Sequence, residues 1–195
     1  FSQGVTRRGS YAAYLDISHP EIEEFLDVRK PTGGDINRKS INLHHAIIIP
    51  DAFMELIDKA TREEGFNDDW DLIDPHSGEV KKTVSAKTLW VKLIQNRVET
   101  GEPYIMFGDA VNRKLPEFQK QLGLKVNQSN LCSEITLPTN DDRTAVCCLS
   151  SVNLEKFDEW EKEDKFIPDL VRFLDNVLEH FINNAPESLA KAKYS

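Results

Sequence analysis

The spacing of apolar residues along the chain alternates between two patterns. Short runs rich in β-branched and aromatic side chains predict strands over residues 11–17, 41–49, 68–75 and 104–107. Apolar residues three and four positions apart predict helices after Pro20, between Pro50 and Gly65, between Ser85 and Gly101, and over 167–182. Strands and helices therefore follow one another along most of the chain.

The strand predicted at 41–49 ends in the continuous apolar run Ala46-Ile47-Ile48-Ile49. A strand without polar alternation is typical of burial on both faces, as in a parallel sheet covered by helices. Strands that alternate with helices at this spacing favour βαβ units. The sequence therefore predicts an α/β fold with a mainly parallel sheet.

Two further patterns lie in the last third of the chain. Residues 145–154 predict a strand in which Cys147 and Cys148 face opposite ways, so that one of them can face a site. The helix predicted over 167–182 has a wide apolar stripe, which indicates packing in a core.

Candidate chemistry is concentrated at Asn130, Cys132 and Glu134, which occupy alternate positions. In an extended chain, residues two apart point to the same face, so these three side chains would share one surface. A thiol beside a hydrogen-bonding amide and a potential base is a catalytic arrangement. A half-buried cysteine that only packs as a small apolar residue fits the same spacing. The spacing by itself leaves both interpretations open.

The first ten residues carry a second set of candidate binding groups. Gly4 and Gly9 permit close approach of the backbone to a ligand, and Arg7 and Arg8 offer planar donor groups suited to phosphate or base edges. A mobile loop or a frayed terminus has the same composition. The adjacent histidines at 44 and 45 point to opposite faces of a strand, so we expect structural roles for them.

Composition narrows the functional classes. With 39% hydrophobic and 29% charged residues, the 195-residue chain suits one domain with a real core. A net charge of −9 disfavours nucleic acid as a partner, because phosphate backbones are bound by clustered Lys and Arg. Because there is no signal sequence at the start and no apolar run near the roughly 18 residues that span a bilayer, we expect a cytoplasmic protein without membrane contact. Three cysteines without zinc-like spacing predict no metal site.

Two sequence motifs surround the cysteines. The first is Asn130-Leu131-Cys132-Ser133-Glu134-Ile135 followed by Leu137-Pro138-Thr139, and the second is Ala145-Val146-Cys147-Cys148-Leu149-Ser150-Ser151-Val152-Asn153-Leu154. Together they resemble the signature of the catalytic subunit of class I ribonucleotide reductases, and the similarity extends along essentially the whole chain. The family enzyme is several times longer, so the chain resembles a central segment of it.

This resemblance implies part of a ten-stranded α/β barrel. Residues 1–195 would form a single partial barrel domain, in which residues 127–137 are the catalytic finger loop and residues 1–10 are a loop linked to the allosteric effector. The implied activity is reduction of ribonucleoside diphosphates to deoxyribonucleotides by thiyl-radical chemistry.

The resemblance also implies roles for individual residues. Cys132 would be the thiyl radical that takes the 3′ hydrogen, Glu134 the general base on the 3′ hydroxyl, and Asn130 a ligand of the sugar hydroxyls. Cys147 would be one of two thiols that reduce the 2′ position and end as a disulfide, because the family spacing selects it rather than Cys148. The residues implied in substrate or effector binding are Gln3, Gly4, Arg7, Arg8, Gly9 and Ser129.

No cofactor is expected in this chain, because in class I enzymes a separate small subunit with a dimetal centre generates the radical. The expected ligands are a ribonucleoside diphosphate and a dNTP or ATP effector. The rest of the catalytic subunit would complete the barrel, so we expect a fragment, a split gene product or a processed piece that is inactive alone. Two alternatives stay open: a segment of an adenosylcobalamin-dependent class II reductase, and a non-catalytic split piece that complements another subunit.

Overall fold

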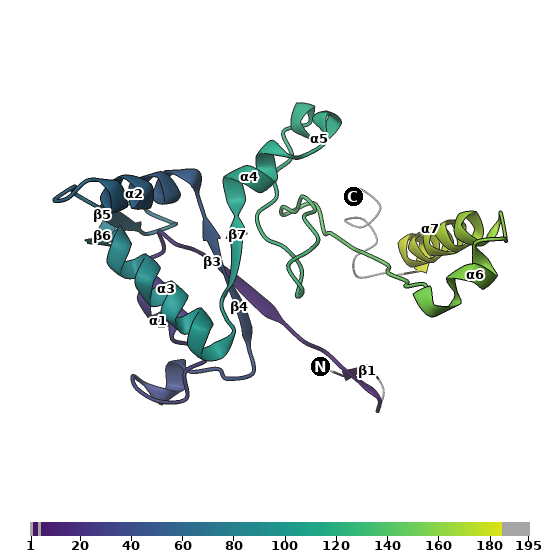
Figure 1. The fold of residues 1–195 in the computed structure, drawn as a ribbon, viewed down its shortest axis with the longest axis horizontal. Coiled ribbons are helices and arrows are strands. Elements are labelled where there is room, and N and C mark those ends of the chain that lie inside the picture. The colour runs from purple at the N-terminus through teal and green to yellow at the C-terminus, as the bar shows by residue number, and fades with distance from the viewer. Residues whose placement is uncertain (1, 4, 185–195) are drawn as a thin grey trace. The chain divides into compact units, whose positions relative to one another are not determined.

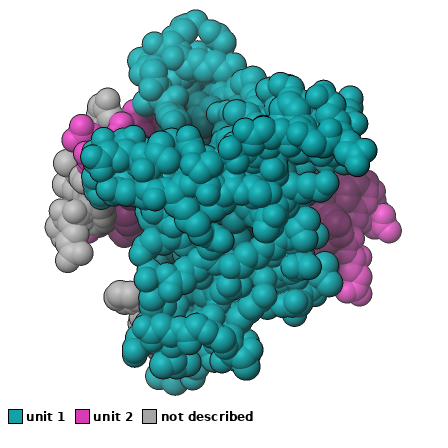
Figure 2. All heavy atoms as spheres, turned by 90° about the vertical axis from the view of Figure 1, so that its left-hand side faces the viewer, with its two compact units in different colours: residues 1–137 teal, residues 138–195 magenta. Residues whose placement is uncertain are grey.

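The computed structural model describes residues 2–3 and 5–184. The chain folds into two compact units, residues 1–137 and 138–195 (Figure 2). The first unit contains β1 (Ser2–Gln3), β2 (Arg7–Arg8), β3 (Ala12–Asp16), α1 (Ile22–Leu26), η1 (Ile36–Arg38), β4 (His44–Ile49), α2 (Asp51–Arg62), β5 (Asp69–Ile73), β6 (Val80–Ser85), α3 (Ala86–Thr100), β7 (Tyr104–Phe107), α4 (Gly108–Arg113) and α5 (Glu117–Gln121). The second contains η2 (Leu154–Lys156), α6 (Phe157–Trp160) and α7 (Phe166–Asn184). Among the helices described, none is long and apolar enough to cross a lipid bilayer.

A parallel sheet with the strand order β3-β4-β7 organises the first unit (Figure 1). Both neighbours of the central strand β4 run parallel to it, so the predictions of an α/β fold and of a parallel sheet are confirmed. The register aligns Tyr14 with Ala46, and Ala46 with Tyr104. Aligned residues of parallel strands point to the same side, so these three side chains form one row across the sheet, the Tyr14–Ala46–Tyr104 row.

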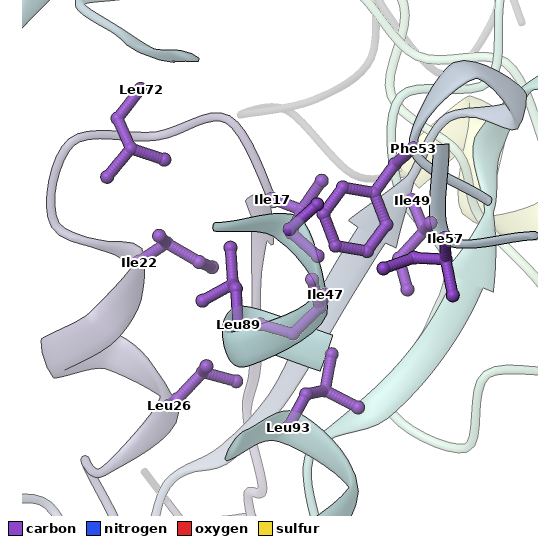
Figure 3. Close-up of a cluster of buried hydrophobic side chains, with 11 residues drawn as sticks. Ile17, Ile22, Leu26, Ile47, Ile49, Phe53, Ile57, Leu72, Leu89 and Leu93 are labelled. Atoms are coloured by element: carbon purple, nitrogen blue, oxygen red, sulfur yellow. The ribbon is translucent and has the colours of Figure 1, made fainter. Parts of the chain in front are cut away.

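Helices α1, α2 and α3 cover one face of this sheet (Figure 1). Side chains at odd-numbered positions in or beside the strands, such as Ile17, Ile47 and Ile49, are fully buried against these helices. The same core includes Ile22, Leu26, Phe53, Ile57, Leu72, Leu89 and Leu93 (Figure 3). Burial of one such side chain contributes roughly 1.5–3 kcal/mol, so this core fixes which way each strand residue points.

The opposite face of the sheet carries a smaller apolar cluster. Its buried members are Met106, Leu115 and Val126, and Tyr14 and Ile48 pack against them. The sheet residues in this cluster are the even-numbered ones, so the Tyr14–Ala46–Tyr104 row lies on this face. The chain that follows β7 therefore packs on the side of the sheet away from α1, α2 and α3.

The boundaries of α3 lie where the sequence predicts them. Ser85 caps α3 by accepting a hydrogen bond from the backbone N–H of Thr88 at 3.1 Å, and Gly101 ends the helix with a φ of 79°. Strand β5 forms where it was predicted, but β6 carries no apolar pattern that predicts it. Its first four residues are exposed, and it forms because it pairs antiparallel with β5.

The first residues form a short antiparallel hairpin where an irregular loop was expected. Ser2 lies opposite Arg8 and Gln3 opposite Arg7, in β1 and β2. Gly4 lies outside the described residues, as do the side chains of Gln3 and Arg7. Arg8 and Gly9 are exposed.

Two predictions for the second unit are wrong. Residues 144–153, within the predicted strand 145–154, have no regular secondary structure. An extended segment becomes a strand only where a neighbour supplies hydrogen bonds, and none of the sheets in the described residues includes this segment. Helix α7 forms as expected, but its apolar stripe is not in a core: Val171 and Phe173 are about 60% exposed, and no described residue of α7 is buried.

The described strands form open sheets, in which β3 and β7 are the edges of the parallel sheet. A closed barrel is therefore not formed by the described residues. Unpaired edge strands expose backbone N–H and C=O groups that can pair with further strands.

Glu102, two residues before β7, links three basic side chains. Its carboxylate lies 2.5 Å from Nδ1 of His44, 3.2 Å from both the backbone nitrogen and Nδ1 of His45, and 3.3 Å from the guanidinium of Arg29. Both histidines thus bind the same carboxylate, although they are adjacent at the start of β4 and point to opposite faces of the sheet. Burial raises the pKa of Glu102, but the hydrogen bonds from His44 and the His45 amide and the charge of Arg29 more than offset it, so the pKa lies below its ordinary value. At His45, burial is the largest influence and lowers the pKa.

We expect Glu102→Gln to lower the free energy of unfolding at pH 7 by about 2 kcal/mol, because a neutral amide leaves Arg29 without its charge partner. The lowered pKa of Glu102 means that its carboxylate stabilises the fold above the unfolded-state pKa of about 4.3. That contribution is lost as the pH falls through the folded-state pKa. The difference between wild type and variant in urea titrations should therefore shrink as the pH drops below about 4.3.

Glu99→Gln is the matched control, because Glu99 pairs with Lys30 at 3.1 Å but its side chain is 59% exposed. It should cost less than about 1 kcal/mol at pH 7. Equal losses in the two variants would show that the Glu102 cluster does not stabilise the first unit beyond a surface ion pair.

Candidate active site

The segment that carries Cys132 is attached to the first unit through Asn112 of α4. The side-chain amide of Asn112 donates to the carbonyl oxygen of Val126 at 3.0 Å, and its oxygen accepts from the backbone N–H of Val126 at 2.9 Å. This two-way pairing imitates one step of a strand ladder, and the Val126 side chain is buried beside it. The chain therefore enters residues 127–137, the cysteine loop, from a fixed point.

The cysteine loop contains a turn and is not extended, so the geometry predicted from alternation is wrong. The backbone N–H of Ser133 donates to the carbonyl oxygen of Asn130 at 3.1 Å, and Ser133 has a φ of 66°. A positive φ at a serine is uncommon and reverses the chain direction. The sequence gives no glycine or proline at this point that would predict the turn.

The turn is closed by side chains that accept or donate to its own backbone. Oδ1 of Asn130 accepts from the backbone N–H groups of Glu134 and Ile135, each at 3.1 Å. The hydroxyl of Ser129, which is buried, donates to the carbonyl oxygen of Ile135 at 2.6 Å. Asn130 therefore acts in this loop as an acceptor for backbone amides.

The turn leaves Cys132 and Glu134 exposed, whereas Leu131, Ser133 and Ile135 are partly buried. Exposed and partly buried residues thus alternate along residues 131–135, as they would in a strand, although the backbone here forms a turn. A nearby cavity of about 460 Å³ is lined by Met106, Lys114, Leu115, Ser129 and Ser133 among others. The loop therefore presents the candidate thiol and the candidate base at an open surface of the first unit.

The Tyr14–Ala46–Tyr104 row borders the loop. The phenol of Tyr14 donates to the carbonyl oxygen of Asn130 at 2.8 Å. The ring of Tyr104 is stacked on the ring of His44, with centroids 6.3 Å apart and planes within 6°. Burial raises the pKa of the Tyr104 phenol, and the negative charges of Glu102 and of a Cys132 thiolate raise it further. Tyr104 therefore stays a neutral donor beside the loop at neutral pH.

The other predicted residues lie away from this loop in the sequence. Cys147 and Cys148 belong to the second unit, where Cys147 is exposed and Cys148 is partly buried. Arg8 and Gly9 belong to the exposed hairpin at the start of the chain. Within the described part of the chain, no group of three or more His, Cys, Asp or Glu side chains could hold a metal ion.

A family model described as ribonucleotide reductase, barrel domain, matches residues 1–194. The chain belongs to this family. The ribonucleoside-diphosphate reductase large subunit of Invertebrate iridescent virus 3 is 46% identical, over 100% of this chain and 38% of the relative. The putative large subunit of Frog virus 3 (isolate Goorha) is 53% identical, over 94% of this chain and 31% of the relative.

A solved structure gives the same result. The class Id ribonucleotide reductase alpha subunit of Actinobacillus ureae matches with a TM-score of 0.72 and 32% sequence identity, over 97% of this chain and 32% of that chain. The resemblance predicted from the two cysteine motifs is therefore confirmed, and the α/β architecture is that of part of a reductase barrel. The chain spans roughly a third of the length of these relatives.

Sequence reasoning missed the residues that support the loop. Tyr14 and Asn112, which bind the backbone at Asn130 and Val126, are separated from Cys132 by other elements, so no local spacing connects them to it. Tyr14 lies in a predicted strand, where an aromatic residue is expected simply to pack against the core, so the sequence does not single it out. Only the strand register and the hydrogen bonds of the reductase fold bring these two residues to the loop.

We expect Asn130→Ala to loosen the turn, because the amides of Glu134 and Ile135 lose their acceptor. Hydrogen–deuterium exchange of these two amides should become about tenfold faster, as expected for the loss of a local hydrogen-bond pair. Peptide-level mass spectrometry over the cysteine loop measures this rate. Asn130→Asp, which keeps the acceptor oxygens, should exchange much more slowly than Asn130→Ala, and identical exchange in all three proteins would refute the acceptor role.

Proposed function

We propose that the chain is the part of a ribonucleoside-diphosphate reductase catalytic subunit that supplies the thiyl-radical cysteine. The observation that carries the proposal is the match to the reductase barrel family across the cysteine loop, together with the exposure of Cys132 and Glu134 on that loop. A thiol that must reach a bound sugar has to be exposed on a backbone with a fixed conformation. The hydrogen bonds of the loop support both requirements.

In this proposal, the sulfur of Cys132, as a thiyl radical, takes the hydrogen atom from C3′ of the ribonucleotide and becomes a thiol, which leaves the radical on C3′. Glu134 accepts the proton of the 3′ hydroxyl. The 2′ hydroxyl leaves as water, and Cys147 and a second thiol supply two hydrogen atoms and end as a disulfide. Cys132 then returns its hydrogen to C3′, which regenerates the thiyl radical, and Glu134 returns the proton to the 3′ oxygen.

Binding of substrate is assigned to the start of the loop. Because Oδ1 of Asn130 accepts from loop amides, its Nδ2 amino group is the donor for a sugar oxygen. Ser129 contributes by closing the loop through Ile135 and by lining the adjacent cavity.

The hairpin at the start of the chain is the proposed link to the deoxynucleotide or ATP effector. Arg8 and Gly9 are exposed there, and Arg7 and Gln3 lie in the paired strands. Gly4 lies between Gln3 and Arg7 in the sequence. Two arginines beside a glycine suit the phosphates or the base of a nucleotide, because each guanidinium group can donate paired hydrogen bonds. The net charge of −9 disfavours anion binding at other surfaces of the chain.

The partners follow from the same assignment. The rest of the catalytic subunit would pair with the open edges β3 and β7, and would cover the apolar side chains that α7 exposes. A separate small subunit with a dimetal centre would supply the radical. We place the assembly in the cytoplasm, where ribonucleotides are available.

Cys132→Ser should abolish deoxyribonucleotide formation in the assembled catalytic subunit and leave nucleotide binding nearly unchanged. An oxygen radical is not readily formed at serine, while the side chain keeps its size and exposure. Turnover and equilibrium binding of a ribonucleoside diphosphate measure the two properties. Substantial turnover by the variant would remove Cys132 from the mechanism.

The second unit offers a paired comparison at adjacent cysteines. Cys147→Ser should stop multiple-turnover reduction, because the disulfide can no longer form. Cys148→Ser, at the partly buried neighbour, should keep activity and cost about 1 kcal/mol of stability. Turnover and thermal unfolding of both variants distinguish the roles, and the reverse result would show that Cys148 is the redox thiol.

A further inference from the structure

Tyr14 occupies a position that connects the sheet to the cysteine loop. It lies on edge strand β3, two strands away from β7, and its phenol reaches the main-chain carbonyl oxygen of Asn130 at 2.8 Å. This is a contact between residues 116 positions apart in the sequence. Its ring packs against the apolar cluster on the loop side of the sheet, so the direction of the O–H is fixed by the sheet.

The accepting carbonyl belongs to the first residue of the turn. The same oxygen accepts the N–H of Ser133, and the side chain of Asn130 accepts the N–H groups of Glu134 and Ile135. Three hydrogen bonds from backbone amides of the turn are therefore accepted by Asn130, and the Ser129 hydroxyl adds one to the carbonyl oxygen of Ile135. Tyr14 is the contact that ties Asn130 to the sheet.

The sheet residue beside Tyr14 is small and buried. Ala46 is fully buried and aligned between the two tyrosines of the row. Tyr104, on the other side of Ala46, is itself oriented by stacking on His44, which Glu102 binds. Both tyrosines of the row are thus held by contacts of their own, Tyr14 to Asn130 and Tyr104 to His44.

We propose that Tyr14 is a positioning residue for Cys132: its phenolic O–H, donated to the Asn130 carbonyl, sets the position of the turn that carries the thiol. The inference rests on the proposed function of Cys132. Hydrogen-atom transfer depends steeply on the distance between donor and acceptor atoms, so a small displacement of the turn lowers the rate of the chemical step more than it lowers substrate binding.

The test is Tyr14→Phe, which removes the O–H and keeps the ring. In the assembled catalytic subunit with its radical-generating partner, kcat should fall about fivefold to tenfold while KM stays within about twofold. In the 195-residue chain, amide exchange of residues 133–135 should accelerate by a similar factor, with the exchange of β4 unchanged. Incorporation of 3-fluorotyrosine at position 14, which keeps an O–H donor, should restore both properties at pH 7.

Tyr11→Phe is the matched control, because the Tyr11 side chain is 70% exposed and precedes the same strand. It should change neither kcat nor exchange in the loop. If Tyr14→Phe keeps wild-type kcat, or keeps wild-type exchange at residues 133–135, the positioning role is overturned. If exchange across β4 accelerates as well, Tyr14 is a packing residue of the sheet and the proposal fails in the same way.

The failure of this inference is distinguishable from failure of the proposed function. Exchange in the loop does not depend on turnover, and it reports the Tyr14 contact even if Cys132→Ser stays active. An active Cys132→Ser variant would remove the radical assignment, whereas unchanged exchange in Tyr14→Phe would remove only the positioning role.

Discussion

Parallel pairing of β3, β4 and β7 in one register is the constraint on which the first unit depends. In such a sheet, aligned residues share a face, so odd-numbered apolar residues such as Leu15, Ile47 and Ile105 meet α1, α2 and α3. The even-numbered residues are thereby directed to the other side. A shift of one residue in any strand would exchange the two sets, bury the tyrosines under helices and expose the isoleucines. The hydrophobic core on one face thus determines which side chains face the cysteine loop on the other.

Polar side chains then hold the irregular segments next to the sheet in place. Glu102 joins Arg29, His44 and His45, so the start of β4 and the approach to β7 are held together by one buried carboxylate. At the other side of the sheet, Asn112 and Tyr14 bind backbone atoms at Val126 and Asn130. Each of these side chains satisfies main-chain groups that a loop would otherwise leave to water, which gives an irregular segment a defined conformation.

The two units differ in how much of their apolar surface they bury within themselves. The first unit buries a core and closes the cysteine loop with its own side chains. In the second, residues 144–153 lack strand partners and the apolar residues of α7 are largely exposed. This difference agrees with a chain that spans roughly a third of its reductase relatives, because sheet edges and an exposed apolar helix are surfaces that further chain would cover.

The sequence by itself determined the local elements and the family. Apolar spacing, the Ser85 cap and Gly101 predict α3, the run 46–49 predicts a strand of a parallel sheet, and the two cysteine motifs identify the reductase barrel. These signals act within a few residues, where propensity and capping decide the structure. Only the tertiary structure decided that the loop turns at Ser133, that Tyr14 binds Asn130, and that residues 144–153 form no strand. Those outcomes depend on partners far away in the chain, which supply or withhold the hydrogen bonds that local sequence leaves open.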